Sequence, residues 1–79
     1  MDDTFARVAK VAATRYGRDP SALRPDDDVF VALDIDSVEA LELVSAIEAE
    51  LGVEVPDHAL LSVRTFAQLV EAIERGRRA

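Results

Sequence analysis

Hydrophobic positions recur at helical spacing in three stretches of the chain, which are separated by segments rich in proline, glycine and acidic residues. In the first stretch the apolar side chains share one face of a predicted helix, and they are Phe5, Val8, Ala9, Ala12 and Tyr16. Asp3 or Thr4 can cap the start of this helix, and Gly17 can end it. The pattern therefore predicts an amphipathic helix near the N-terminus.

A second helix is predicted from Ser37 to Leu51, with Gly52 as its stop signal. At about 100° per residue, its core stripe comprises Ala40, Leu43, Val44, Ile47 and Leu51. The opposite face carries Val38, Glu42, Ser45 and Ala49. Val38 is thus predicted to be an exposed apolar residue one position after a serine.

The last helix has the clearest signals. Thr65 and Gln68 form a T-x-x-Q capping box, Gly76 is the predicted stop, and the core stripe is Phe66, Leu69, Val70 and Ile73. The tail at residues 75–79 is expected to fray.

Between the second and last helices, alternating Val53 and Val55 predict a short extended piece before Pro56. Asp57 can then cap a brief helix at residues 58–62, in which Leu60 and Leu61 face the interior or a partner.

Residues 18–36 connect the first two helices. Pro20 and Pro25 exclude a continuous helix there, and the apolar residues of the segment are spaced as core anchors: Leu23, Val29, Phe30 and Leu33. A connection this long in a small domain is either functional or disordered, and the anchors favour an ordered loop.

These elements predict an all-α fold: a single domain over residues 1–79, built as a small four-helix bundle with a long first loop and a short third helix. The expected core is Phe5, Val8, Ala12, Leu23, Phe30, Leu33, Leu43, Val44, Ile47, Leu51, Val55, Phe66, Leu69, Val70 and Ile73.

Composition narrows the possible functions. A domain of 79 residues buries only about 60% of its unfolded surface, so a deep catalytic cavity is not expected. The chain has no cysteine and one histidine, His58, so no metal site is predicted. No apolar run approaches the roughly 18 residues of a membrane span, and the start M-D-D-T lacks the basic residues of a signal peptide. We expect a cytoplasmic monomer.

Charge is strongly segregated in this chain. The net charge of −7 argues against nucleic-acid binding, which depends on lysine and arginine. No lysine or arginine lies between Arg24 and Arg64, whereas acidic residues are frequent there. Such acidity can serve solubility alone, or it can steer the protein toward basic partners.

Ser37 stands where the acidic stretch becomes a helix. Asp36 is the predicted N-cap, with Glu39 completing a capping box. A phosphate ester on Ser37 would meet the free N–H groups and the positive end of the helix dipole. The alternative is that Asp36 is only a cap and Ser37 an ordinary polar residue.

The chain resembles an acyl carrier protein in features that follow one another along nearly its whole length. They are the Asp36-Ser37 junction, the Glu42-Leu43 pair, the G-V-x-V-P-D segment at residues 52–57 and the final amphipathic helix. The resemblance implies a freestanding, type II carrier in which a phosphopantetheinyl transferase attaches 4′-phosphopantetheine, taken from coenzyme A, to Ser37.

The resemblance also implies that the acidic helix after Ser37 docks on basic patches of partner enzymes, with Glu42 and Glu48 at matching positions. Val38 and Ser45 lie on the same surface. The implied partners are basic-surfaced acyltransferase, ketosynthase, or adenylation and ligase enzymes.

Several positions depart from the family pattern. Asp34 replaces the usual glycine, Val38 replaces leucine, and Ser45 stands where fatty-acid carriers often place a larger apolar residue. The third helix is also less acidic at residues 60–62 than the third helix of fatty-acid carriers. These departures favour a dedicated pathway, such as polyketide or hybrid peptide assembly, over housekeeping fatty-acid synthesis.

Three alternatives stay open at the level of sequence. One is an enzyme using a Ser37–His58 pair, which the residues disfavour because they give no sign of an oxyanion site. Another is an acidic helical interaction domain without a cofactor. The third is a carrier of aminoacyl or D-alanyl groups.

Overall fold

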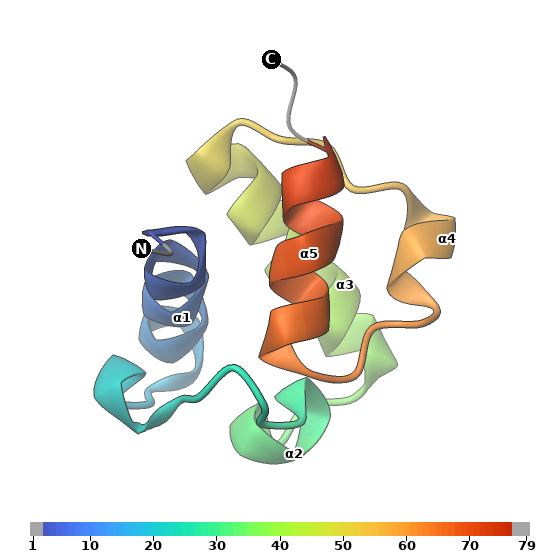
Figure 1. Ribbon diagram of the computed structural model, residues 1–79. Coiled ribbons are helices and arrows are strands. Elements are labelled where there is room, and N and C mark those ends of the chain that lie inside the picture. The colour runs from blue at the N-terminus through green and yellow to red at the C-terminus, as the bar shows by residue number, and fades with distance from the viewer. Residues whose placement is uncertain (1–2, 77–79) are drawn as a thin grey trace.

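The computed structural model describes residues 3–76, and its regular secondary structure is helical (Figure 1). The elements are α1 (Asp3–Tyr16), the 3-10 helix η1 (Pro20–Ala22), α2 (Val29–Leu33), α3 (Ser37–Leu51), α4 (Asp57–Leu60) and α5 (Phe66–Gly76). The predicted all-α class is therefore confirmed. No helix among residues 3–76 is long and apolar enough to cross a membrane.

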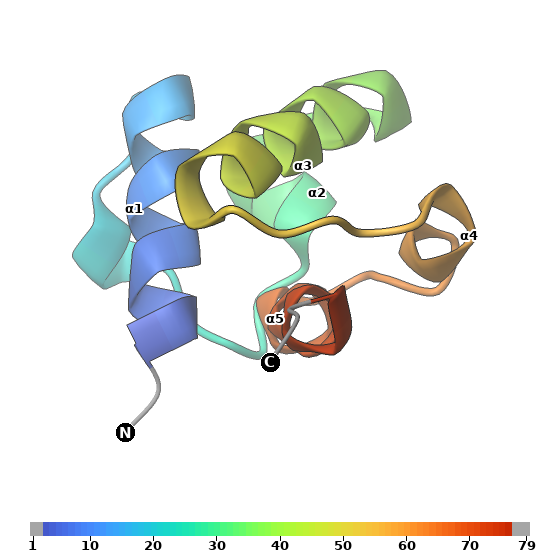
Figure 2. The same cartoon turned by 90° about the horizontal axis from the view of Figure 1, so that it is seen from above.

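The three long helices α1, α3 and α5 surround the core, and α4 closes the side away from α1 (Figures 1 and 2). Their buried faces follow the predicted stripes: Val8 and Ala12 of α1, Ile47 of α3 and Ile73 of α5 are completely or almost completely buried. Three predicted core residues, Phe5, Phe30 and Leu51, are only partly buried and pack against the core from its edge. The buried hydrophobic residues that the expected core did not include are Ala9, Ala13, Val29, Ile35, Val53 and Ala72.

The predicted cap of α1 is wrong. Asp3 and Thr4 both lie inside the helix, and Thr4 is buried. The predicted stop is confirmed, because Gly17 adopts a left-handed φ of 65° and the Arg18 N–H donates to the Ala13 carbonyl oxygen at 2.8 Å. This bond satisfies a carbonyl that the helix end would otherwise leave free.

The segment from 18 to 36 is ordered but is not a plain loop. Asp19 caps η1 by accepting from the Ser21 N–H at 2.9 Å and the Ser21 hydroxyl at 2.8 Å, and these bonds lower the pKa of Asp19. Pro20 begins η1, because a first helical position needs no N–H donor. The prediction that no continuous helix spans this segment is confirmed.

Helix α2 is the main departure from the predicted architecture, since residues 3–76 form five α-helices instead of four. Asp28 caps it by accepting from the N–H groups of Phe30 (2.8 Å) and Val31 (3.1 Å). Backbone bonds from Val29 to Arg64 (2.7 Å) and from Phe66 to Asp27 (3.1 Å) tie this segment to the start of α5. A helix of five residues is too short to show periodicity, so these tertiary bonds decide where it forms.

Helix α4 begins one residue earlier than predicted and is shorter. Asp57 lies in its first turn and is not its cap, which is Pro56 without a side-chain hydrogen bond. The Thr65–Gln68 capping box of α5 is confirmed: the Gln68 N–H donates to Thr65 Oγ1 and the Thr65 N–H to Gln68 Oε1, both at 3.1 Å.

Gly76 is the last residue of α5 and lies against the Glu54 carbonyl oxygen, where a Cβ atom would collide with backbone. Glycine is thus needed at this position because the backbone of Glu54 comes so close, and not because the chain makes a left-handed turn. Residues 75 and 76 of the predicted frayed tail are helical, and residues 77–79 lie outside the described part of the chain.

Candidate functional site

Ser37 is the first residue of α3, and its side chain is exposed. The predicted capping box in front of it is confirmed. Asp36 Oδ1 accepts from the Glu39 N–H at 2.9 Å, and Glu39 Oε1 accepts from the Asp36 N–H at 3.1 Å. Because this box is satisfied without Ser37, the serine hydroxyl is available for chemistry and makes no hydrogen bond within residues 3–76.

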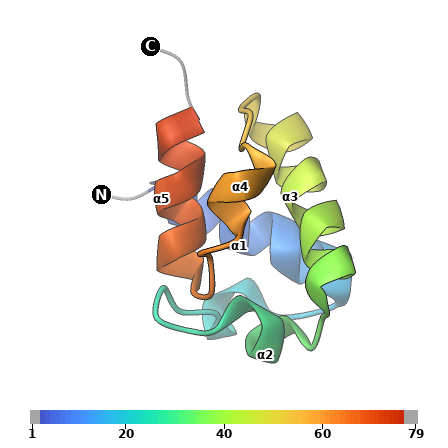
Figure 3. The ribbon, with the colours of Figure 1, turned by 90° about the vertical axis from the view of Figure 1, so that its right-hand side faces the viewer.

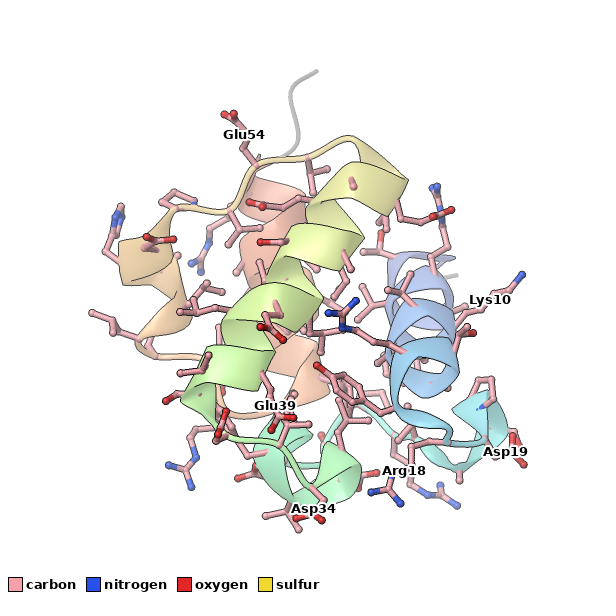
Figure 4. All side chains as sticks on the ribbon, turned by 180° about the vertical axis from the view of Figure 1, so that it is seen from behind. Lys10, Arg18, Asp19, Asp34, Glu39 and Glu54 are labelled. Atoms are coloured by element: carbon pink, nitrogen blue, oxygen red, sulfur yellow. The ribbon has the colours of Figure 1, made fainter. Side chains whose placement is uncertain are left out.

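The residues just before Ser37 are fixed by a backbone hydrogen bond and by a left-handed turn. The Ile35 N–H donates to the Phe30 carbonyl oxygen at 3.0 Å, and Ile35 is buried. Asp34 ends α2 in the left-handed conformation, with φ 56° and ψ 53°, which explains why glycine suits this position in the family pattern. Figure 4 shows Asp34 at this turn, below the first turn of α3 that carries Glu39.

Helix α1 also braces the first turn of α3. The Tyr16 hydroxyl at the end of α1 donates to the Glu39 carbonyl oxygen at 3.1 Å. Just after α1, the Arg18 guanidinium donates to the carbonyl oxygen of Leu33, the last residue of α2, at 3.2 Å. Ser37 thus stands on a fixed helix end and not on a free loop, which is the arrangement that positions a group most reproducibly.

The N-terminus of α3 suits an anionic group. The capping box uses the Glu39 N–H, and the Ala40 N–H donates to the Asp36 carbonyl oxygen, but the N–H groups of Ser37 and Val38 have no intrahelical acceptor. A phosphodiester on Ser37 would lie beside these donors and the positive end of a 15-residue helix.

Ser37 also lines a largely apolar pocket of about 250 Å³ between α2, α3, α4 and α5. Figure 3 shows these four helices from the side on which α4 lies between α3 and α5. Leu41 and Leu61 line the pocket although they are 49% and 88% exposed. Leu41 was not among the predicted site residues. It lies three residues after Val38 on the same side of the helix, and this spacing was the signal that could have identified it.

The residues predicted for partner recognition do not have equivalent surroundings. Val38 is 63% exposed and Ser45 is exposed. Glu42 is exposed and lies 3.8 Å from Arg15 of α1. Glu48, in contrast, is only half-exposed, and its Oε2 accepts from the Val55 N–H at 2.7 Å, which holds the 53–55 segment against α3.

The sequence alternative of a Ser37–His58 pair has no geometric support. His58 is exposed and lines a separate crevice with Glu48, Glu54 and Arg75, whereas Ser37 lines the apolar pocket. No cluster of three or more His, Asp or Glu side chains that could hold a metal occurs in the described part of the chain.

Comparison with known proteins agrees with this geometry. The sequence profile of the family described as "Phosphopantetheine attachment site" matches residues 6–73. The chain is 38% identical to acyl carrier protein 2 of Pseudomonas aeruginosa, over 94% of either chain. It is 33% identical to an acyl carrier protein of Trieres chinensis, over 92% of this chain and 91% of the relative. It is 32% identical to an acyl carrier protein of Phaeodactylum tricornutum, over 95% of this chain and 99% of the relative.

A match of this extent defines the chain first as a phosphopantetheine-bearing carrier domain, which is not itself a catalyst. Because these relatives are acyl carrier proteins that match it over nearly their whole length, the chain belongs to the acyl carrier protein family. The prosthetic group is therefore covalently attached 4′-phosphopantetheine, whose terminal thiol carries acyl groups as thioesters. The exposed hydroxyl at a helix N-terminus, beside an apolar pocket, fits such a group.

Proposed function

We propose that a phosphopantetheinyl transferase attaches the prosthetic group to Ser37, and that the protein then carries acyl intermediates between enzymes of a dedicated pathway. The observation that carries this proposal is the exposed Ser37 hydroxyl, which is free of hydrogen bonds within residues 3–76 and lies at the rim of the apolar pocket. The replacements at Asp34, Val38 and Ser45 favour polyketide or hybrid peptide assembly. The proposed setting is the cytoplasm, where the monomer visits basic-surfaced ketosynthase, acyltransferase or ligase enzymes.

Intact-mass measurement tests the attachment directly. After incubation with a transferase and coenzyme A, the protein should gain one phosphopantetheinyl group, and peptide mapping should find it on the peptide that contains Ser37. Modification of Ser21, Ser45 or Ser62 instead would show that the assigned serine is wrong.

The apolar pocket is the proposed place for the first carbons of the cargo. Its volume of about 250 Å³ is slightly below the roughly 300 Å³ at which ligand pockets usually begin, so it suits a short chain. Ala40 lines the pocket and is half-buried, whereas Ala49 of the same helix lies outside it and is exposed.

We therefore expect the hexanoyl-loaded protein to be more stable than the acetyl-loaded one by about 1–3 kcal/mol, since each buried CH₂ contributes about 0.8 kcal/mol. Ala40→Leu should remove most of this difference by filling the pocket, and Ala49→Leu should retain it. Urea unfolding of the loaded forms measures both. Equal stability of the hexanoyl and acetyl forms in the wild type would place the cargo on the surface.

Partner docking is proposed to use the exposed face of α3 that carries Val38, Glu42 and Ser45. Glu42→Lys should slow association with a basic partner on the order of tenfold, because a charge near the docking site steers the encounter. Glu74→Lys on α5 makes the same change in net charge at another exposed site and is the matched control. Glu48→Lys is a poorer test, since it also breaks the bond to Val55.

Val38→Asp should instead raise the dissociation rate, because Val38 offers an apolar contact and no steering. Stopped-flow measurements at several salt concentrations separate the two effects, since the Debye length falls from about 10 Å at 0.1 M to about 3 Å at 1 M. Association that is independent of salt and unchanged in Glu42→Lys would rule out an acidic docking face.

A further inference from the structure

A second surface of unusual charge lies beside the proposed docking face. A groove of about 530 Å³ runs between α1 and α3, lined by Arg7, Lys10, Thr14 and Arg15 of α1 and by Ala46 and Glu50 of α3. The four α1 side chains are exposed. Figure 4 shows α1 and α3 side by side, with the labelled Lys10 side chain extending into solvent from the outer side of α1, away from α3.

The groove is locally positive in a protein whose net charge is −7. Three cationic side chains line it against one carboxylate, that of Glu50. Arg15 is 3.8 Å from Glu42, whereas Arg7 and Lys10 make no ion pair within residues 3–76.

The helix dipole favours only one of these cations. Arg7 and Lys10 are three residues apart on one helix, a spacing at which like charges repel. Only Arg15 lies in the last turn, where a positive charge is favourable next to the helix dipole. Arg7 and Lys10 are exposed and make no ion pair within residues 3–76, so both are available to an acidic ligand.

We propose that this groove, the basic α1 groove, receives an acidic segment of the same enzyme whose basic patch docks on α3. The inference rests on the proposed function, because it extends the proposed docking face. Helix α3 forms one wall of the groove through Ala46 and Glu50 and carries Glu42 and Ser45 on its exposed face, so the two surfaces are continuous. A partner with adjoining basic and acidic patches would be selected over one that is only basic.

The net charge of −7 favours a protein partner, in which an acidic segment can lie beside basic surface, over a uniformly anionic partner. A nucleic acid or an anionic membrane would be repelled by the rest of a surface with net charge −7. A second copy of the chain carries the same net charge and is repelled for the same reason.

Two synthetic peptides test the groove and the docking face separately. At about 0.1 M salt the Debye length is about 10 Å, so repulsion by the whole protein is screened while contacts in the groove persist. In nuclear magnetic resonance titrations of the wild type, octaglutamate should shift the backbone amide signals of residues 7–15. Octalysine should shift those of residues 38–49, which belong to the docking face.

Charge reversal gives the decisive comparison. Arg7→Glu combined with Lys10→Glu should weaken octaglutamate binding about fivefold or more, as expected for the loss of two exposed ion pairs. Arg24→Glu combined with Arg75→Glu makes the same change in net charge outside the groove and should weaken it far less. Circular dichroism checks that both double variants are folded.

The outcomes separate this inference from the proposed function. If octaglutamate leaves the amides of residues 7–15 unshifted, or binds both double variants equally, the groove assignment is wrong even where octalysine binds α3. If octalysine fails to shift residues 38–49, the docking face on α3 is wrong, whatever octaglutamate does.

Discussion

Replacing Ser37 by alanine is expected to abolish phosphopantetheinylation completely while leaving the domain folded. The variant lacks the only atom to which the phosphodiester could be joined at this position. The fold should persist because Ser37 is exposed, Asp36 and Glu39 make the capping box without it, and alanine is the best helix former.

Intact mass after incubation with a transferase and coenzyme A, together with circular dichroism, tests both halves of this expectation. Ser62→Ala is the matched control, since Ser62 is also exposed but lies outside the proposed docking face on α3. It should be modified like the wild type. Continued modification of Ser37→Ala would contradict the assignment, and loss of helicity would show that Ser37 has a structural role.

Replacing Ile47 by alanine is expected to cause a large loss of stability. Ile47 is 0% exposed, at the centre of the core stripe. Truncating a buried isoleucine to alanine costs about 2–5 kcal/mol through lost burial and the cavity that is left. Stabilities of natural domains are about 5–15 kcal/mol, so this is a large share for a domain of this size.

Chemical denaturation measures the effect, with Leu61→Ala as the control. Leu61 is 88% exposed, so its truncation should change the free energy of unfolding by no more than about 0.5 kcal/mol. A loss below about 1 kcal/mol for Ile47→Ala, well under the usual range, would mean that the core face of α3 is rotated.

The long helices and the capping box in front of Ser37 were predictable because their signals are local. A capping box acts within one turn, as at Asp36 and Glu39, and an apolar stripe repeats often enough in α3 and α5 to fix which face is buried. The same reasoning failed at the start of α1, where the helix continues through Asp3 and Thr4. It also missed α2, which depends on backbone bonds to Arg64 and Phe66 far along the chain.

The sequence alone determined the class of fold, the helix that begins at Ser37, and the acidic character of the region around it. Only the tertiary structure decided which polar side chains are available to a partner. It engages Glu48 with the Val55 N–H, leaves Glu42 exposed near Arg15, and assembles the pocket at Ser37 from four separate helices. The physical reason is range: capping and periodicity act within a few residues along the chain, whereas pockets, grooves and side-chain availability arise when distant helices pack together.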